Sequence, residues 1–195
     1  MKRPIECVAL SWILLALFGF SLTAWAQTET EVVKEFNARV KAYMALQKRV
    51  STNVPPLANT ETDPAKIAIR TKALANGIQQ ARANAVAGEI FFPNAARAFR
   101  QMIHTELQGK AGAPSRETVK TGNPREEENA AKVVLAVNGI YPTTAPRSSV
   151  PPSLLLNLPQ LPKGLEYRFL GRHLILLDSM ANLIVDYLPD AVPKA

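Results

Sequence analysis

The stretch LEYRFLGRHLILLDSMANLIVDYL, residues 165–188, decides how this chain folds. Apolar and polar side chains alternate over 165–169, and this period of two is typical of a β-strand that buries one face more deeply than the other. Gly171-Arg172 follows as a two-residue turn of type II′, because glycine supplies the positive φ that this turn needs at its first central position. The predicted hairpin places Phe169 opposite Leu174.

A third strand extends the hairpin into an antiparallel β-meander. Turn-forming residues cluster over 178–182. The alternation then resumes over 183–187, and Pro189 ends the pairing. A four-residue second turn would place Ile175 opposite Asp186, so Asp186 is expected on the more polar face of the sheet.

This more polar face carries the candidate functional residues. They are Arg168, His173, Ile175, Leu177, Ile184 and Asp186. Because the face is too apolar to be left in water, something should cover it. The cover could be intramolecular, supplied by the chain's own helices or its proline-rich segment. It could instead be a partner protein, a second copy of the chain or an apolar ligand.

An enzymatic alternative rests on His173 and Asp186. In the register above they are diagonal neighbours, about 7–8 Å apart between backbones, and an aspartate-oriented histidine could act as a general base. The sequence offers no G-x-S-x-G motif, no cysteine after Cys7 and no glycine-rich phosphate loop. Metal-ligating residue types do not recur at ligand spacing either. The sequence therefore favours a non-catalytic protein without a metal or cofactor.

Residues 1–26 are typical of a secretory signal peptide. Lys2-Arg3 forms the positive n-region, residues 8–22 are apolar, and Ala24-Trp25-Ala26 is an A-x-A cleavage site before Gln27. An uncleaved membrane anchor is the alternative, although the apolar run is short for a bilayer core of about 30 Å. We therefore expect a periplasmic or secreted protein.

The mature chain, residues 27–195, contains no cysteine, because Cys7 is removed with the signal. Its stability must therefore come from its core rather than from disulfides. The formal charge of +7 becomes +6 when two basic residues and one acidic residue leave with the signal. This charge favours solubility or attraction to anionic envelope surfaces. Nucleic acid is not expected in that compartment, and membrane contact would be transient or made through an uncleaved signal.

The helical part of the mature chain is predicted to span about 30–109. Apolar residues recur at steps of three and four over 31–50, which indicates an amphipathic helix with a basic, solvated outer face. Asp63-Pro64 supplies the N-cap and first-turn proline of a second helix, which should end near Gly88. A third helix is closed by Gly109.

Less regular segments connect these helices to the meander. Residues 110–123 are predicted to be a mobile loop, and Asn123-Pro124 then resembles a helix start. The segment VVLAV, 133–137, could be helix or strand, and its β-branched content favours a short strand that joins the meander. Six of the fifteen prolines lie in 141–162. This segment should dock on the core, with one helical turn over 153–158, or else bind a partner.

Three motifs carry a resemblance to a known group. They are IFFPNAARAFRQMI at 90–103, VNGIYP at 137–142 and the C-terminal PPSLLLNLPQLPKGLEYRFLGRHLILLDSMANLIVDYLPDAVP at 151–193. From about Glu89 onward the chain resembles a family of small uncharacterised exported bacterial proteins, whose closing segment has the type LEYR-F-G-L-L-D-ANLIVD. The resemblance implies bacterial export and a shared fold, and it implies no activity. In that family an acidic residue often occupies the position of His173, which weakens a mechanism that depends on His173.

Together these patterns predict a single α+β domain, in which N-terminal amphipathic helices pack on a small C-terminal antiparallel sheet. The expected function is that of an exported, non-catalytic binding or structural module of the bacterial envelope. A hydrolase-like enzyme using His173 and Asp186 is the alternative. The expected partners are an envelope protein, a second copy of the chain or an apolar ligand, and the sequence does not distinguish them.

Overall fold

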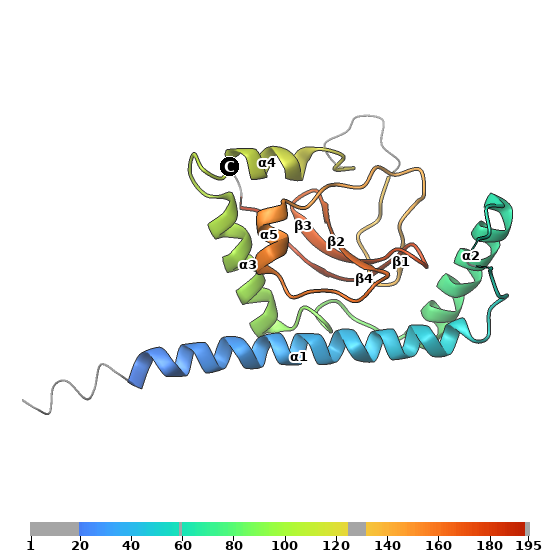
Figure 1. Cartoon of the computed structure of the whole chain (residues 1–195), viewed down its shortest axis with the longest axis horizontal. Helices are drawn as coiled ribbons and strands as arrows, with labels where there is room; N and C mark the ends of the chain where they lie inside the picture. The colour runs from blue at the N-terminus through green and yellow to red at the C-terminus, as the bar shows by residue number, and fades with distance from the viewer. Residues whose placement is uncertain (1–19, 59, 125–131, 194–195) are drawn as a thin grey trace, which may run out of the picture.

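The computed structural model describes residues 20–58, 60–124 and 132–193. In the described chain, α1 to α4 precede an antiparallel sheet with the strand order β1-β4-β3-β2, and α5 lies between β1 and β2 in the sequence (Figure 1). The helices are α1 (Phe20–Ser51), α2 (Pro64–Ala81), α3 (Pro93–Leu107), α4 (Ala113–Lys120) and α5 (Pro152–Asn157). The strands are β1 (Gly139–Ile140), β2 (Leu165–Leu170), β3 (His173–Asp178) and β4 (Leu183–Leu188). The predicted α+β class with a C-terminal antiparallel sheet is confirmed.

The β2–β3 hairpin forms in the predicted register. Phe169 lies opposite Leu174, and the hairpin closes through Gly171-Arg172. Gly171 has a φ of 60°, in the left-handed region that glycine enters at no steric cost. The local alternation of the sequence was therefore sufficient to place these two strands.

The predicted register between β3 and β4 is wrong beyond its first two pairs. Ile175 lies opposite Tyr187, and Leu176 lies opposite Asp186. A β-bulge inserts Val185 as an extra residue on β4, and a bulge of this kind shifts every later pair by one position. Because Leu176 belongs to the helix-facing core, Asp186 points toward the helices and not toward the face where it was expected.

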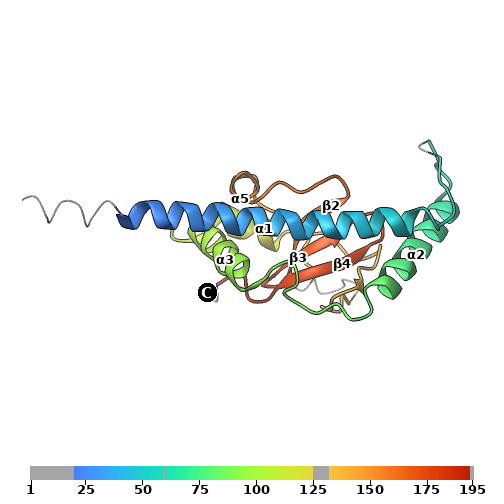
Figure 2. The same cartoon turned by 90° about the horizontal axis from the view of Figure 1, so that it is seen from below.

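The main core lies between one face of the sheet and the helices, and α1 crosses that face (Figure 2). Four aromatic rings meet at its centre, from Phe36 of α1, Phe91 before α3, Phe99 of α3 and Tyr167 of β2. Neighbouring centroids lie 5.0 to 5.9 Å apart. Tilted and edge-on aromatic pairs at such distances each contribute about 0.5–1.5 kcal/mol beyond their burial.

The three long helices agree unevenly with the sequence predictions. α1 ends at Ser51, one residue after the predicted end, but it begins at Phe20, well before the predicted start at Glu31 and within the expected signal peptide. The Asp63 side chain accepts a hydrogen bond from the Ala65 N–H at 2.9 Å, which confirms the predicted cap of α2. That helix ends at Ala81, however, well before the predicted Gly88. The third helix ends at Leu107 with Gln108 as its C-cap, one residue before the predicted Gly109.

The connecting segments differ more from the predictions. The predicted loop over 110–123 contains α4, and 133–137 forms neither helix nor strand. The sheet is joined instead by β1, two residues further on. In the proline-rich segment the predicted helical turn is present as α5. The helix start predicted after Asn123 falls mostly outside the described residues, as does most of the predicted signal peptide.

The second face of the sheet is covered by the chain itself. Val133, Tyr141 and Ala145 pack on a second apolar cluster that the strands contribute, namely Leu170, Ile175, Leu177 and Ile184. Most of this cover, residues 133–145, is irregular backbone. An intramolecular segment therefore protects the face whose cover the sequence left open.

Candidate functional site

Three of the candidate binding residues serve the second core. Ile175, Leu177 and Ile184 have no exposed surface and lie beneath the cover of residues 133–145. Arg168 is half-buried, pairs with Glu166 at 2.7 Å and donates to the Ser148 carbonyl at 3.0 Å. These side chains hold the sheet to its surroundings.

The structure does not bring His173 and Asp186 together. His173 lies opposite Leu170 at the end of the hairpin, and Leu170 belongs to the second core. The His173 Nδ1 atom accepts a hydrogen bond from the Asp190 N–H at 3.1 Å. The bulge turns Asp186 toward the helices, so the two side chains lie on opposite faces of the sheet.

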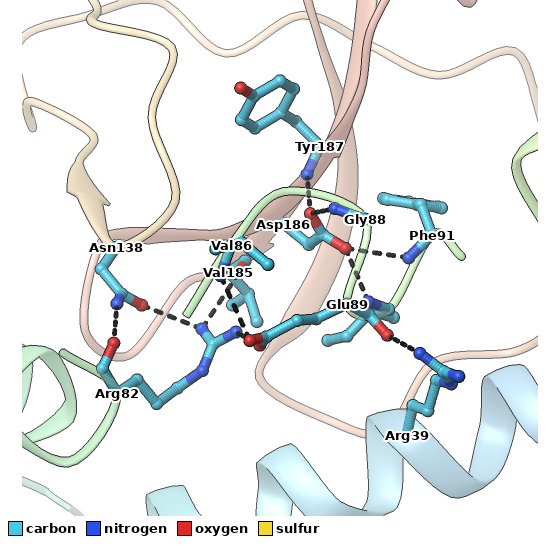
Figure 3. A network of polar contacts seen from close by, with 11 residues as sticks. Arg39, Arg82, Val86, Gly88, Glu89, Phe91, Asn138, Val185, Asp186 and Tyr187 are labelled. Carbon is cyan, nitrogen blue, oxygen red and sulfur yellow. Dashed lines mark hydrogen bonds and ion pairs between the residues drawn. The ribbon is translucent and has the colours of Figure 1, made fainter. Parts of the chain in front are cut away.

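Asp186 instead accepts hydrogen bonds from four main-chain N–H groups (Figure 3). Its Oδ1 accepts from Gly88 and Tyr187, both at 2.8 Å. Its Oδ2 accepts from Ile90 at 2.7 Å and from Phe91 at 2.8 Å. The carboxylate is fully buried, and a buried charge is tolerated when such donors replace its water. Asp186 therefore fixes the loop between α2 and α3 onto β4.

Asp178 is the second fully buried carboxylate. Its Oδ2 accepts from the Tyr43 hydroxyl and from the Gln47 amide, each at 2.6 Å. Its Oδ1 accepts from the N–H groups of Met180 and Ala181 at 2.8 and 3.0 Å. Burial raises the pKa of the Tyr43 phenol well above its usual value, and the negative charge of Asp178 raises it further. The phenol therefore remains a donor, and Asp178 pins α1 to the β3–β4 turn.

Arg82 forms the centre of a third buried contact, and its side chain is only 8% exposed. It donates to the Asn138 side chain at 2.9 Å and to the Val185 carbonyl at 3.0 Å, and it pairs with Glu89 at 3.1 Å (Figure 3). Its guanidinium also lies 5.2 Å from the centroid of the Tyr43 ring. One cation thus joins the end of α2 to α1, β4 and the turn before β1.

A cleft of about 590 Å³ opens between α1 and the segment that follows α2, and Arg39, Tyr43, Arg82 and Glu89 are among its lining residues. The Arg39 guanidinium donates to the Glu89 carbonyl and lies 4.4 Å from the centroid of the Phe92 ring. Of the three arginines that line it, Arg39 and Arg82 are therefore already engaged within the protein, whereas Arg49 is exposed. The cleft offers a shaped surface for binding more than a reactive group.

Neither Asp178 nor Arg82 was predicted to organise the packing of the helices on the sheet. Gln47 was the clearest indication in the sequence of the contact with Asp178, because it lies four residues after Tyr43, on the buried stripe of α1. A polar side chain at such a position indicates a buried partner. Arg82 gave no such signal, because the predicted second helix continued past it.

No family model, no curated protein and no solved structure matches this chain. Over residues 20–58, 60–124 and 132–193, no three histidine, cysteine or carboxylate side chains gather where they could hold a metal ion. In the same ranges, no helix combines the length and hydropathy required to cross a bilayer. Function must therefore be inferred from the geometry of the chain.

Proposed function

We propose that this is an exported bacterial protein that serves as a non-catalytic binding or structural module of the cell envelope. The observation that carries the proposal is the complete use of Asp178 and Asp186. An ionised carboxylate has about four acceptor sites, and each of these aspartates receives four hydrogen bonds from the protein itself. A general base must reach the proton that it removes. These buried carboxylates support a scaffold role instead.

Export is supported by the character of residues 1–26 and by the way α1 packs. Among its described side chains, the first that contact the core are Val32 and Phe36. Both lie after the expected cleavage site between Ala26 and Gln27. Signal removal would therefore leave the core contacts of Val32 and Phe36 in place.

Cell fractionation tests the proposal. The full-length gene with a C-terminal tag is expressed in a Gram-negative host, and we expect a protein that begins at Gln27 in the periplasm or medium. The variant Ala24→Lys/Ala26→Lys removes the small residues that define the cleavage site, and should yield uncleaved precursor in the membrane fraction. Ala38→Lys/Ala45→Lys is the matched control, because both alanines are exposed on α1. Uncleaved wild-type protein in the cytosol would overturn the proposal.

A further inference from the structure

The β2 strand forms one edge of the sheet and is protected along only part of its length. Near its end, the Ser148 hydroxyl accepts from the Phe169 N–H at 2.6 Å and donates to the Phe169 carbonyl at 2.8 Å. At its start, the Leu165 N–H donates to the Pro162 carbonyl at 3.1 Å. Because Phe169 turns its main-chain groups outward, the alternation of a strand turns those of Tyr167 outward as well. No described residue pairs with the outward N–H and C=O of Tyr167.

A groove of about 480 Å³ lies at this unpaired position. Its walls come from two parts of the proline-rich segment, and its apolar lining residues include Val150, Leu155 and Leu161. Leu155 is 46% exposed. An unpaired edge beside an apolar groove is the arrangement by which proteins add an extended peptide to a sheet.

We propose that this groove binds a short extended segment of a partner polypeptide, which pairs with Tyr167 as an added strand. The inference rests on the proposed binding function and names the chemistry of its partner. The free edge between the two protected positions spans four residue steps, about 13 Å at the rise of a strand, so about three partner residues fit. The central residue exchanges hydrogen bonds with Tyr167 and directs an apolar side chain toward Leu155 and Leu161. Its neighbours are polar, because they lie beside the ion pair of Glu166 and Arg168.

The same geometry argues against a second copy of β2 as the occupant. That strand would carry its own Ser148 contact and its own turn at Pro162, one on each side of Tyr167. Two such flanked edges would meet at these obstructions before their main chains reached the spacing of about 4.8 Å that strand pairing requires. A single extended segment without flanking structure meets no such obstacle.

Selection from a random heptapeptide phage library tests the proposal with the protein purified from cells that carry the full-length gene. We expect enriched peptides with an apolar residue between polar ones and without proline at the centre. A synthetic enriched peptide should shift the Tyr167 amide resonance and slow its hydrogen exchange. Methylation of the peptide's central nitrogen removes the pairing N–H, and should weaken binding at least about tenfold, which corresponds to about 1.4 kcal/mol.

Two neighbouring leucines of α5 supply a matched pair of variants. Leu155→Glu places a charge in the groove and should weaken peptide binding at least about tenfold. Leu156 is 88% exposed and is not among the lining residues, so Leu156→Glu should leave the affinity within about twofold. Both variants should keep the wild-type melting temperature, because neither side chain is buried.

The proposal would be overturned by no enrichment, by binding that tolerates the N-methyl group, or by equal effects of the two leucine variants. A peptide-free dimer whose Tyr167 amide is already protected would assign the edge to a second copy and would also overturn it. Binding by the purified protein does not depend on its compartment. Failure of the peptide experiment and failure of the export experiment are therefore distinguishable.

Discussion

The two buried aspartates anchor the sheet by different donors. Asp178 receives two side-chain donors from α1, whereas Asp186 receives only main-chain N–H groups. In both sites the charge is stable because every acceptor position is filled. Removing one acceptor oxygen is therefore more harmful than it would be at the surface, since the buried donors are left without partners.

Asp186→Asn is expected to lower the free energy of unfolding by at least about 2 kcal/mol, because each buried donor left without a partner costs about 1–3 kcal/mol. The asparagine NH₂ would face main-chain N–H groups, so about half of the hydrogen bonds are lost while their donors stay buried. Asp190→Asn is the matched control, because Asp190 is 63% exposed in its pair with Arg172, and such pairs contribute at most about 1 kcal/mol. Urea unfolding followed by circular dichroism measures both. A loss below about 1 kcal/mol for Asp186→Asn would contradict the anchoring role.

Among the helices and strands, the features that depend on neighbouring residues could be predicted from the sequence. The features that depend on contacts with distant residues could not. The β2–β3 hairpin and the cap of α2 arise from local alternation and local hydrogen bonds. The bulge at Val185 depends on Asp186 meeting N–H groups almost a hundred residues earlier. The short helix α4 buries only Val119, so its apolar pattern is too weak to predict a helix. A single sequence contains no direct record of such contacts.

Glu106 of α3 shows how distant contacts hold these short elements. It accepts hydrogen bonds from Ser115 of α4 at 2.6 Å and from Ser153 of α5 at 2.5 Å. The Ser115 and Ser153 hydroxyls lower the pKa of the Glu106 carboxyl below its usual 4.5. The folded carboxyl therefore binds a proton less readily than the unfolded one. Its stabilising effect is complete above about pH 4.5 and is lost as the pH falls through the folded pKa.

Glu106→Gln should consequently differ from the wild type most at neutral pH. We expect a free energy of unfolding lower by up to about 1 kcal/mol at pH 7, because solvent screens this partly exposed group. The difference should shrink as urea unfolding is repeated at lower pH, down to about pH 3. Glu117→Gln on α4 is the control, since Glu117 is exposed and should show a smaller difference at pH 7. A Glu106→Gln difference that does not change with pH would contradict the assigned role.

At the scale of the whole molecule, the sheet lies between two unlike layers. Helices and a cluster of aromatic rings cover one face, and mostly irregular chain over 133–145 covers the other. Tyr141 is the largest residue of this second cover and has no exposed surface. Its hydroxyl donates to the Pro146 carbonyl, which secures the cover to itself. The second layer thus depends on one ring more than on regular backbone pairing.

Tyr141→Ala should therefore open the second face, whereas Tyr141→Phe should keep it closed. Loss of the ring leaves a cavity over Ile175 and Ile184, and costs about 3–5 kcal/mol by the usual range for large aromatic side chains. Tyr141→Phe keeps the ring and loses one hydrogen bond, at about 1 kcal/mol. Opening would expose apolar strand surface, so Tyr141→Ala should bind a hydrophobic dye and self-associate in light scattering, and Tyr141→Phe should not. If Tyr141→Ala and Tyr141→Phe had equal melting temperatures and equal dye binding, the cover would contribute nothing to holding the sheet. The second core would then have to be stable on its strands alone.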